Sequence, residues 1–395
     1  MTHAAGPVRK VLHVLGDKSW KPQYHYLGST KDIVGRRDYF ASRGIECVEM
    51  QVKGRHDNIC LEMLQAMDLA GELSGIDAVV MEHPRYPDAM RWLNDTHPRI
   101  RLMIRGHNAE AIHQLHTAYA FLASGLSGFK WRWKRARIAL NNLWDRFRFD
   151  LVCGHRADYI LAIADWEAEH YWPVMTRREK VLAVPYFVPK EYEFTPPSDL
   201  AKVSRCLCAM SADWTPLAHH AARVMVELLK KTTPEQTKGW KFAITGDLGK
   251  HRDSYKPLKS SGRCDITGNV DNPFEYMYRS RAMAHLSNLG MGFKTKLLDF
   301  VTCGGWLIVQ KTLYDRQPKE LQPFCLVVHP LTPESFLQAL KKAKAPWPDN
   351  SHVNDDLRER AFAALDIAFG HNGPAAKPAA KAVPDSEVRA PAPVG

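Results

Sequence analysis

The feature that most constrains this chain is a series of short, nearly continuous apolar runs, each separated from the next by a segment with helical periodicity. In the first half, the runs cover residues 8–16, 45–52, 77–83, 100–107, 158–164 and 180–186. Strands that are apolar on both faces and alternate with helices, such as residues 59–73, are typical of a parallel sheet covered by helices on both sides. We therefore predict a doubly wound α/β domain, with a long helical region from residue 109 to about residue 150.

The same pattern restarts in the second half of the chain. Its apolar runs cover residues 205–211, 240–246, 264–270, 282–287, 305–311 and 325–329, and predicted helices cover 217–231, 333–344 and 356–369. Pro185, Pro189, Pro196 and Pro197 lie between the two patterns, as in an interdomain linker. Because 395 residues are too many for one ordinary domain, we expect two.

The expected domain limits follow from these patterns. An N-terminal Rossmann-like domain covers residues 1–190, a C-terminal Rossmann-like domain covers 191–348, a helix covers 349–370, and a disordered Pro/Ala-rich tail covers 371–395. Rossmann-like domains bind ligands at the carboxyl ends of their strands, so we expect a site between the two domains.

Composition favours a soluble, cytoplasmic protein. The sequence has no run of eighteen apolar residues and no basic segment followed by an apolar signal core. Its eight cysteines include no Cys-x-x-Cys pair, and Cys206 and Cys208 alternate on one face of a predicted strand, so we interpret these two as core thiols. The net charge of +11 indicates an anionic partner, which could be nucleic acid, a membrane surface or a phosphorylated substrate.

Basic residues and tryptophans are concentrated in residues 129–148. A helix of this composition suits the surface of an anionic bilayer, with the indoles at headgroup level, and would make the protein peripheral on the inner face of the cell membrane. Stacking on single-stranded nucleic acid is a weaker alternative, and we expect no nucleic-acid partner. The remaining interpretation is a solvated basic helix whose tryptophans point into the domain.

The segment Gly292-Phe-Lys-Thr-Lys-Leu-Leu-Asp299 carries the clearest chemistry. A helix N-terminus preceded by glycine attracts phosphate and lets a ligand approach the backbone, and Lys294 and Lys296 add full charges there. Asp299 follows Lys296 by three residues, so the two share a helix face. A cation for phosphate and a carboxylate for sugar hydroxyls suit a nucleoside diphosphate. An ordinary exposed amphipathic helix is the alternative.

Several other segments fall into a recognisable order. They are Arg105-Gly-His-Asn-Ala-Glu110, Ala157-Asp-Tyr-Ile-Leu-Ala-Ile-Ala-Asp-Trp-Glu167, Val184-Pro-Tyr-Phe-Val-Pro189, Ser211-Ala-Asp-Trp-Thr-Pro216, Ile266-Thr-Gly-Asn-Val-Asp271 and the segment 292–310. In order and spacing they resemble motifs of the GT-B glycosyltransferases, close to glycosyltransferase family four, over roughly residues 8 to 345. The resemblance implies a GT-B fold, with two Rossmann-like domains facing across a cleft.

The resemblance also implies a donor site. Lys296, with Lys294, would bind the donor diphosphate, and Asp299 would hold the ribose. Gly292, Phe293 and Leu297 belong to the same signature. Asn269 and Val270 lie in the segment whose backbone meets the nucleotide base, and we add Gly246, which ends a predicted strand.

On the other side of the cleft, we expect His107 to touch the donor sugar, with Asn108 beside it. Glu82 and His83 also end a predicted strand, and Glu82 could contact the acceptor or act as a base. Acceptor contacts are expected from N-domain loops around residues 16–28. Because His107, Glu110, His113 and His116 recur at roughly helical spacing, a metal site there is a weak alternative, and we predict no bound metal.

The expected activity is transfer of a sugar from a nucleotide-diphosphate donor to a glycan, a lipid or another acceptor, in surface polysaccharide or glycoconjugate synthesis. The resemblance implies retention of configuration without a metal, and no cofactor other than the donor. Met291, Met210 and the segment 211–214 depart from the family, replacing a glutamate, a glycine and a basic pair. A sugar-nucleotide epimerase and a catalytically silent partner protein therefore remain as alternatives.

Overall fold

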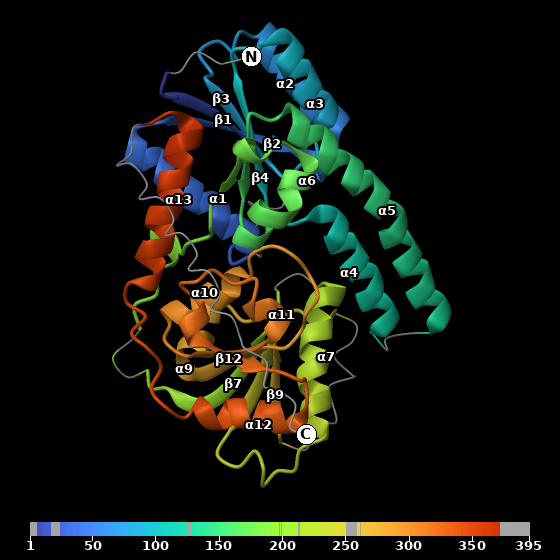
Figure 1. The fold of residues 1–395 in the computed structure, drawn as a ribbon, viewed down its shortest axis with the longest axis vertical. Coiled ribbons are helices and arrows are strands. Elements are labelled where there is room, and N and C mark those ends of the chain that lie inside the picture. The colour runs from blue at the N-terminus through green and yellow to red at the C-terminus, as the bar shows by residue number, and fades with distance from the viewer. Residues whose placement is uncertain are drawn as a thin grey trace, which may run out of the picture.

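The computed structural model describes residues 6–16, 24–124, 128–196, 198, 200–211, 214–249, 259–260 and 262–371. Two α/β halves lie one above the other in Figure 1, each built on a parallel sheet. Part of the expected acceptor loop, residues 17–23, lies outside the described residues, as does almost all of the predicted tail.

The N-terminal sheet has the strand order β2-β1-β3-β4-β5-β6, and every neighbouring pair is parallel. Its strands are β1 (Lys10–Gly16), β2 (Glu46–Val52), β3 (Ala78–Glu82), β4 (Arg101–Gly106), β5 (Tyr159–Ala162) and β6 (Val181–Ala183). Its helices are α1 (Gly28–Arg43), α2 (Asp57–Leu69), α3 (Pro87–Thr96), α4 (Glu110–Ala123), α5 (Phe129–Arg156) and α6 (Trp172–Met175), with a π-helical turn over Glu167–Tyr171. All six strands predicted for this half are confirmed.

The C-terminal sheet has the order β12-β11-β10-β7-β8-β9 and is also parallel throughout. Its strands are β7 (Val203–Ala209), β8 (Lys241–Thr245), β9 (Cys264–Gly268), β10 (Ser280–His285), β11 (Trp306–Gln310) and β12 (Cys325–Val328). Its helices are α7 (Pro216–Lys230), α9 (Pro273–Arg279), α10 (Thr295–Thr302), α11 (Lys311–Tyr314) and α12 (Pro333–Lys342). The predicted strands are again confirmed, and Cys206 and Cys208 are buried thiols within β7.

The long helical region expected over residues 109–150 is two helices, not one. α4 and α5 lie side by side and extend beyond the N-terminal sheet toward α7 (Figure 1). Small side chains of Ala118, Ala136 and Ala139 are buried where the two helices meet. None of the described helices has both the length and the apolar character needed to cross a membrane.

The last helix, α13 (Val353–Phe369), leaves the C-terminal half and lies along α1 of the N-terminal half (Figure 1). Arg43 donates to both carboxylate oxygens of Asp366 at 2.8 Å, and Phe369 packs against Tyr39 and Phe40 with ring centroids 5.5 Å apart. Residues 184–189 at the start of the linker are buried, and Asn354 of α13 exchanges two hydrogen bonds with the backbone of Val188. The two halves are therefore joined by the linker and by α13.

Candidate functional site

A cleft of about 700 Å³ lies between the two halves, at the carboxyl ends of the C-terminal strands. This volume is in the range of ordinary small-molecule sites. Seven of the predicted donor residues line it, namely Gly246, Asn269, Val270, Phe293, Lys294, Lys296 and Asp299. The N-terminal half contributes residues 25–28 and Lys31. Residues 25 and 26 come from the loop in which acceptor contacts were expected.

Two lysines dominate the charge of this cleft. Lys294 donates to the carbonyl of Met291 and Lys296 to the carbonyl of Ala209, each at 2.6 Å. Within the described part of the chain, neither ammonium is within ion-pair distance of a carboxylate. Burial lowers the pKa of Lys296, and burial together with Arg316 and Lys296 lowers the pKa of Lys294 to about 7. Cations that lie close together without an anion are arranged to receive one.

Asp299 is placed differently from the prediction. It is buried, forms an ion pair with Lys31 of α1, and accepts a hydrogen bond from the Tyr186 hydroxyl at 2.9 Å. Burial raises its pKa, and the Lys31 charge opposes that shift. Both carboxylate oxygens are thus engaged within the protein, across the boundary between the halves. A ribose contact by Asp299 stays a prediction and would have to share these oxygens.

Gly292 and Leu297 do not line the cleft. Leu297 is fully buried in the apolar core. Gly292 has a positive φ of 78°, and a Cβ there would lie 2.2 Å from the carbonyl oxygen of His107. The glycine was expected to let a ligand approach the backbone. Instead it lets the donor-side loop, residues 286–294 between β10 and α10, contact the His107-Asn108 segment that follows β4 in the opposite half.

Gly246 occupies the point where the ends of β7 and β8 converge. Its φ is 102°, and a Cβ would lie 2.8 Å from the Cβ of Met210 and from the carbonyl oxygen of Ser211. Any other residue would therefore push these two strand ends apart. Asn269 and Val270, which follow β9, line the same end of the cleft.

A buried network of charges lies at the carboxyl ends of β1, β3 and β4. Asp32 of α1 accepts from Arg36 at 2.5 Å and from Arg105 at 2.6 and 2.9 Å. Glu82 accepts from Arg36, from His13 Nε2 at 2.6 Å and from His107 Nε2 at 2.5 Å. Arg36, with the two histidines, holds the pKa of Glu82 well below its usual range despite burial.

The expectation that Glu82 acts as a base is corrected by this network. A buried carboxylate with a lowered pKa and three donors on its two oxygens is a poor proton acceptor. It instead orients His107, because the proton on Nε2 must point at Glu82. His107 is almost buried, and neither it nor Asn108 lines the 700 Å³ cleft. Their contact with the donor sugar stays a prediction.

His83 follows β3 directly and is the one residue other than glycine with a positive φ, 72°, among the described residues. Its ring stacks on His107 with a centroid separation of 4.3 Å. Backbone strain of this kind is found mainly at functional sites. The two rings mark the end of β3 and β4 nearest to the donor-side loop.

Three residues of the site were not predicted from the sequence. Lys31 neutralises Asp299, and Arg316 donates to the carbonyl of Gly290 at 2.9 Å in the donor-side loop. Glu167 accepts from the backbone of Ala109 at 2.8 Å and of Gly292 at 2.7 Å, so one carboxylate oxygen joins the two halves. Burial raises the pKa of Glu167 to about 7. Glu167 ends a family-like motif, which was the available signal.

The weak metal alternative on α4 is not supported by the geometry. Among the described residues, the side chains that could share an ion form two other groups, and neither includes His113 or His116. His116 Nδ1 accepts from the backbone of Gly290 at 3.0 Å, and burial lowers the pKa of His113 to about 4. His116 therefore connects α4 to the loop that contains Gly290.

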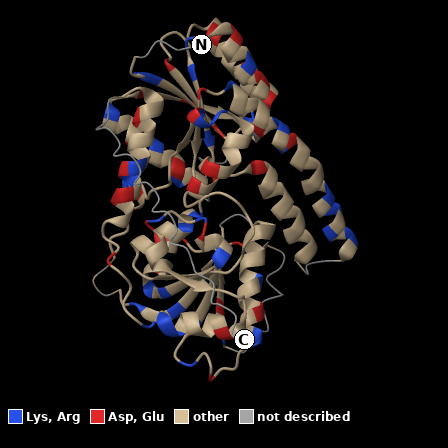
Figure 2. Cartoon of the chain, in the orientation of Figure 1, with Lys and Arg blue, Asp and Glu red and all other residues tan. Residues whose placement is uncertain are grey.

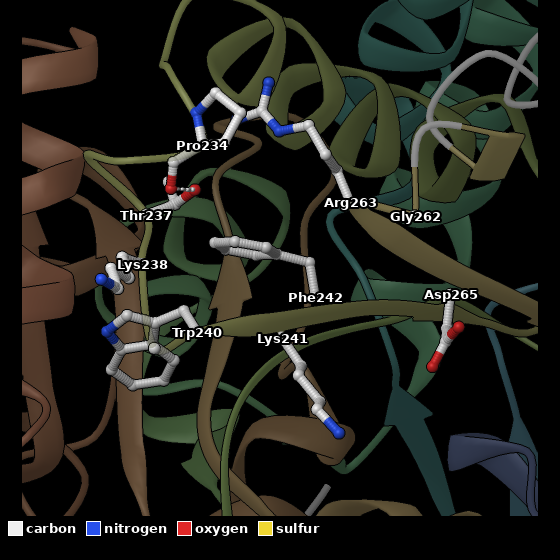
Figure 3. A pocket seen from close by; sticks show the side chains of 10 residues that line it. Pro234, Thr237, Lys238, Trp240, Lys241, Phe242, Gly262, Arg263 and Asp265 are labelled. Atoms are coloured by element: carbon white, nitrogen blue, oxygen red, sulfur yellow. Dashed lines mark hydrogen bonds between the residues drawn. The ribbon is translucent and has the colours of Figure 1, made fainter.

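A second cavity of about 400 Å³ lies near the amino ends of β8 and β9, away from the cleft. Lys238, Lys241 and Arg263 line it, but Figure 3 shows that their charged ends point in different directions. Arg263 donates to Thr232 at 3.0 Å. Its cations therefore do not converge on one ligand, in contrast to Lys294 and Lys296.

No family model matches the chain, and no curated protein matches it in sequence. Solved structures do match. Anabaena HepE in complex with UDP and glucose is 12% identical over 91% of this chain and 95% of its own, with a TM-score of 0.54. Sucrose-phosphate synthase from Thermosynechococcus elongatus is 11% identical over 92% and 96%, with a TM-score of 0.57. A glycosyltransferase from Rickettsia africae is 13% identical over 92% and 93%, with a TM-score of 0.52.

These likenesses establish the architecture. The chain has the GT-B fold, two parallel six-stranded sheets with flanking helices, as its sequence motifs indicated.

Proposed function

We propose that this protein is a glycosyltransferase that takes a sugar from a nucleoside-diphosphate donor. The observation that carries the proposal is the pair of lysines, Lys294 and Lys296, without carboxylate partners in the cleft between two GT-B halves. HepE has been crystallised with UDP and with the nucleotide sugar UDP-glucose, which is a donor of the matching chemical class.

The chemistry follows from charge. Departure of a nucleoside diphosphate leaves negative charge on the β-phosphate, and fixed cations stabilise that charge as it develops. Lys294 and Lys296 would supply the stabilising positive charge. Each would exchange its hydrogen bond to a backbone carbonyl for a stronger one to phosphate. Gly246, Asn269 and Val270 would receive the base at the other end of the cleft. We extend the proposal to transfer with retention and without a metal.

A panel of nucleotide sugars tests this function directly. Nucleotide release with an acceptor or water is the expected result; epimerisation without release would favour the epimerase alternative, and no binding of any donor would favour a silent protein. Lys296→Ala should weaken donor binding by about ten- to hundredfold, the loss expected for one charge-assisted hydrogen bond. Lys238→Ala, in the second cavity, is the matched control and should bind as the unaltered protein does. Equal donor affinity in the two variants would contradict the proposed site.

For the acceptor we propose a glycan or lipid-linked substrate at a membrane surface. On α5, Trp133, Arg137, Leu140 and Trp144 recur at helical spacing, and the two tryptophans are 51% and 67% exposed. Figure 2 shows that Lys and Arg gather on the outer part of this helix. Exposed indoles among cations suit an anionic bilayer surface. On this proposal the protein is cytoplasmic and docks peripherally for glycoconjugate synthesis.

Vesicle binding tests this surface. Replacing both Trp133 and Trp144 with Ala should lower binding to anionic vesicles by at least tenfold, because two exposed indoles supply most of the apolar contact. The matched control replaces Trp92, which is also only partly buried but belongs to α3 and packs against the core of the N-terminal half. Unchanged vesicle binding in the Trp133 and Trp144 double variant would show that α5 is only a solvated basic helix.

A further inference from the structure

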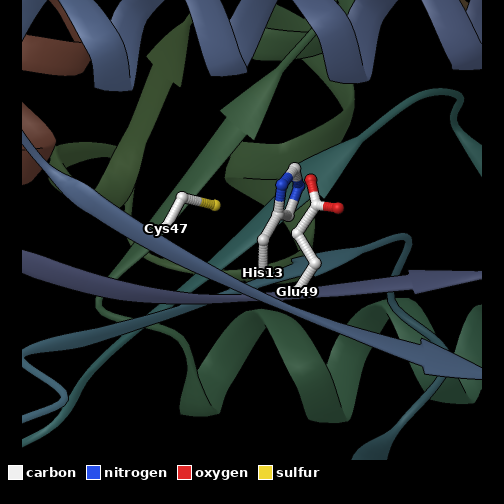
Figure 4. A group of neighbouring side chains, drawn as sticks. All are labelled: His13, Cys47 and Glu49. Atoms are coloured by element: carbon white, nitrogen blue, oxygen red, sulfur yellow. The ribbon is translucent and has the colours of Figure 1, made fainter.

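Three side chains with different ligand atoms meet on one face of the N-terminal sheet. In the parallel pairing of β1 and β2, His13 lies opposite Glu49, and Cys47 lies two residues before Glu49 on the same face. A nitrogen of His13, the thiol of Cys47 and a carboxylate oxygen of Glu49 all lie within 4.8 Å of one another. Figure 4 shows the thiol pointing toward the imidazole, with the Glu49 carboxylate beside the ring.

The orientation of His13 is fixed from its far side. Its Nε2 lies 2.6 Å from Glu82, a carboxylate that also accepts from Arg36 and His107, so Nε2 carries the proton. With its proton on Nε2, the neutral ring keeps a lone pair on Nδ1. Nδ1 is fully buried and has no hydrogen-bond partner in the described structure. Metal-binding histidines in proteins have this arrangement, with a carboxylate holding the other nitrogen.

The other two groups are suited to complete a site. Cys47 is a free, partly buried thiol on the edge strand of the sheet, and Glu49 reaches solvent, so an ion has a route inward. Glu49 accepts from Arg37 at 2.6 and 2.9 Å, but a carboxylate has lone pairs for further partners. A tetrahedral zinc ion holds its ligands about 3.3–3.8 Å apart, so these side chains need to close by roughly 1 Å.

The second group of side chains that could share an ion shows what is special about the first. Asp32, Glu82 and His107 also lie within 4.8 Å of one another. There, however, Arg36 and Arg105 already donate to the two carboxylates. His107 Nε2 donates a hydrogen bond to Glu82. That group is neutralised internally, whereas the first has an unused nitrogen lone pair facing a thiol.

We propose that His13, Cys47 and Glu49 form a binding site for one borderline-soft divalent cation of the zinc type, with a water as fourth ligand. A nitrogen, a thiolate and a carboxylate are the ligand set that zinc accepts and that magnesium and calcium do not prefer. On binding, the thiol loses its proton to solvent and the sulfur bonds to the metal. The ion would tie β2 to β1, and through Glu82 it would be one hydrogen-bonded carboxylate away from His107.

Titration of the reduced, full-length protein with Co²⁺ and Zn²⁺ tests the site, because Co²⁺ bound to a thiolate gives an ultraviolet charge-transfer band. We expect one equivalent of Co²⁺ to produce this band and one equivalent of Zn²⁺ to remove it. Cys47→Ser should abolish the band and weaken Zn²⁺ binding by at least tenfold. Glu49→Gln, a change at the surface, should weaken Zn²⁺ binding while keeping the band.

Cys325→Ser is the matched control, since Cys325 is also a free, partly buried thiol but lies on β12 of the other sheet. It should bind both ions as the unaltered protein does. A charge-transfer band that persists in Cys47→Ser would assign the ion to another thiol and overturn the proposal. Absence of stoichiometric binding by the unaltered protein would overturn it as well.

Discussion

The carboxyl ends of the strands in the two halves both carry charged side chains, but among the described residues these side chains are paired in one half and unpaired in the other. We call these two regions the N-terminal edge and the C-terminal edge. At the N-terminal edge, Asp32 and Glu82 are each held by arginines, and Arg36 bridges them. At the C-terminal edge, Lys294 and Lys296 donate only to backbone carbonyls. Asp32 and Glu82 are buried, whereas Lys294 and Lys296 are partly buried and line the cleft, so the two edges differ in exposure as well as in pairing.

This difference separates the tasks of the two edges. A buried network with all its charges paired keeps its geometry whether or not a ligand is present, and so can hold His107 in one orientation. Partly buried cations without a carboxylate partner are costly until an anion arrives. The N-terminal edge is therefore suited to positioning, and we expect the C-terminal edge to receive an anionic ligand.

Removing a charge from the paired edge should have the largest effect. Asp32→Asn leaves Arg36 and Arg105 buried with one carboxylate fewer, and the free energy of unfolding should fall by about 3–5 kcal/mol. Urea unfolding measures this loss. Asp38→Asn on the same helix, a half-buried position, is the control and should change stability by about 0.5 kcal/mol at most. A similar small change for Asp32→Asn would mean that the network does not stabilise the fold.

A milder change at the same edge tests positioning. Glu82→Gln keeps the shape but cannot accept from Arg36, His13 and His107 as a carboxylate does, so His107 loses its fixed orientation. We expect kcat to fall by about a hundredfold, the loss that misplacement of an active-site group can cause, with donor affinity unchanged. Steady-state kinetics and donor titration separate the two quantities. A change in donor affinity alone would assign Glu82 to the donor side.

The smallest expected effect is a pH dependence at the unpaired edge. The pKa of Lys294 is about 7 in the free protein, where Arg316 and Lys296 lower it and Glu167 opposes them. A bound diphosphate raises that pKa, so donor binding takes up a proton and should be tightest below pH 7. Between pH 7 and pH 8 the Kd should rise by up to about tenfold, the limit for one linked proton.

Calorimetry with a binding nucleotide sugar at several pH values measures this dependence. Lys294→Met removes the titrating group while keeping the length of the side chain, so its Kd should be weaker and nearly independent of pH in this range. A steep dependence that survives in Lys294→Met would assign the proton to another group, with Glu167 as the first candidate, because its pKa is also raised to about 7.

The strands were predictable because a strand buried on both faces is mostly apolar along its length, and β3, with the sequence Ala-Val-Val-Met-Glu, shows this directly. Helix breaks were harder to place. α4 and α5 are both rich in helix-forming residues, and the break between them depends on Ser124 and Gly128, which the periodicity alone did not weigh. Phe293, Lys294, Lys296 and Asp299 were predictable as neighbours in the cleft because they are close in sequence. Their contact with a donor stays a prediction.

Contacts between residues far apart in the sequence could not be predicted from the sequence alone. Lys31 and Asp299 are 268 positions apart, and nothing local to either predicts the ion pair that takes up the carboxylate. The role of Glu82 as a base is disfavoured for a reason of the same kind, because its partners come from β1, α1 and the end of β4. Its contact with an acceptor stays a prediction. Gly292 is a third example. A glycine in the sequence indicates that another group lies close to the backbone, but it does not identify that group.

The return of α13 to the N-terminal half has a practical consequence for dissecting the molecule. A fragment that ends after the second sheet would uncover Tyr39 and Phe40 and leave Arg43 without its carboxylate. A fragment of the second sheet that kept α13 would expose the apolar side of that helix. The smallest N-terminal unit that could be produced separately is therefore discontinuous in sequence, and would need residues 353–369 joined to it or supplied as a peptide.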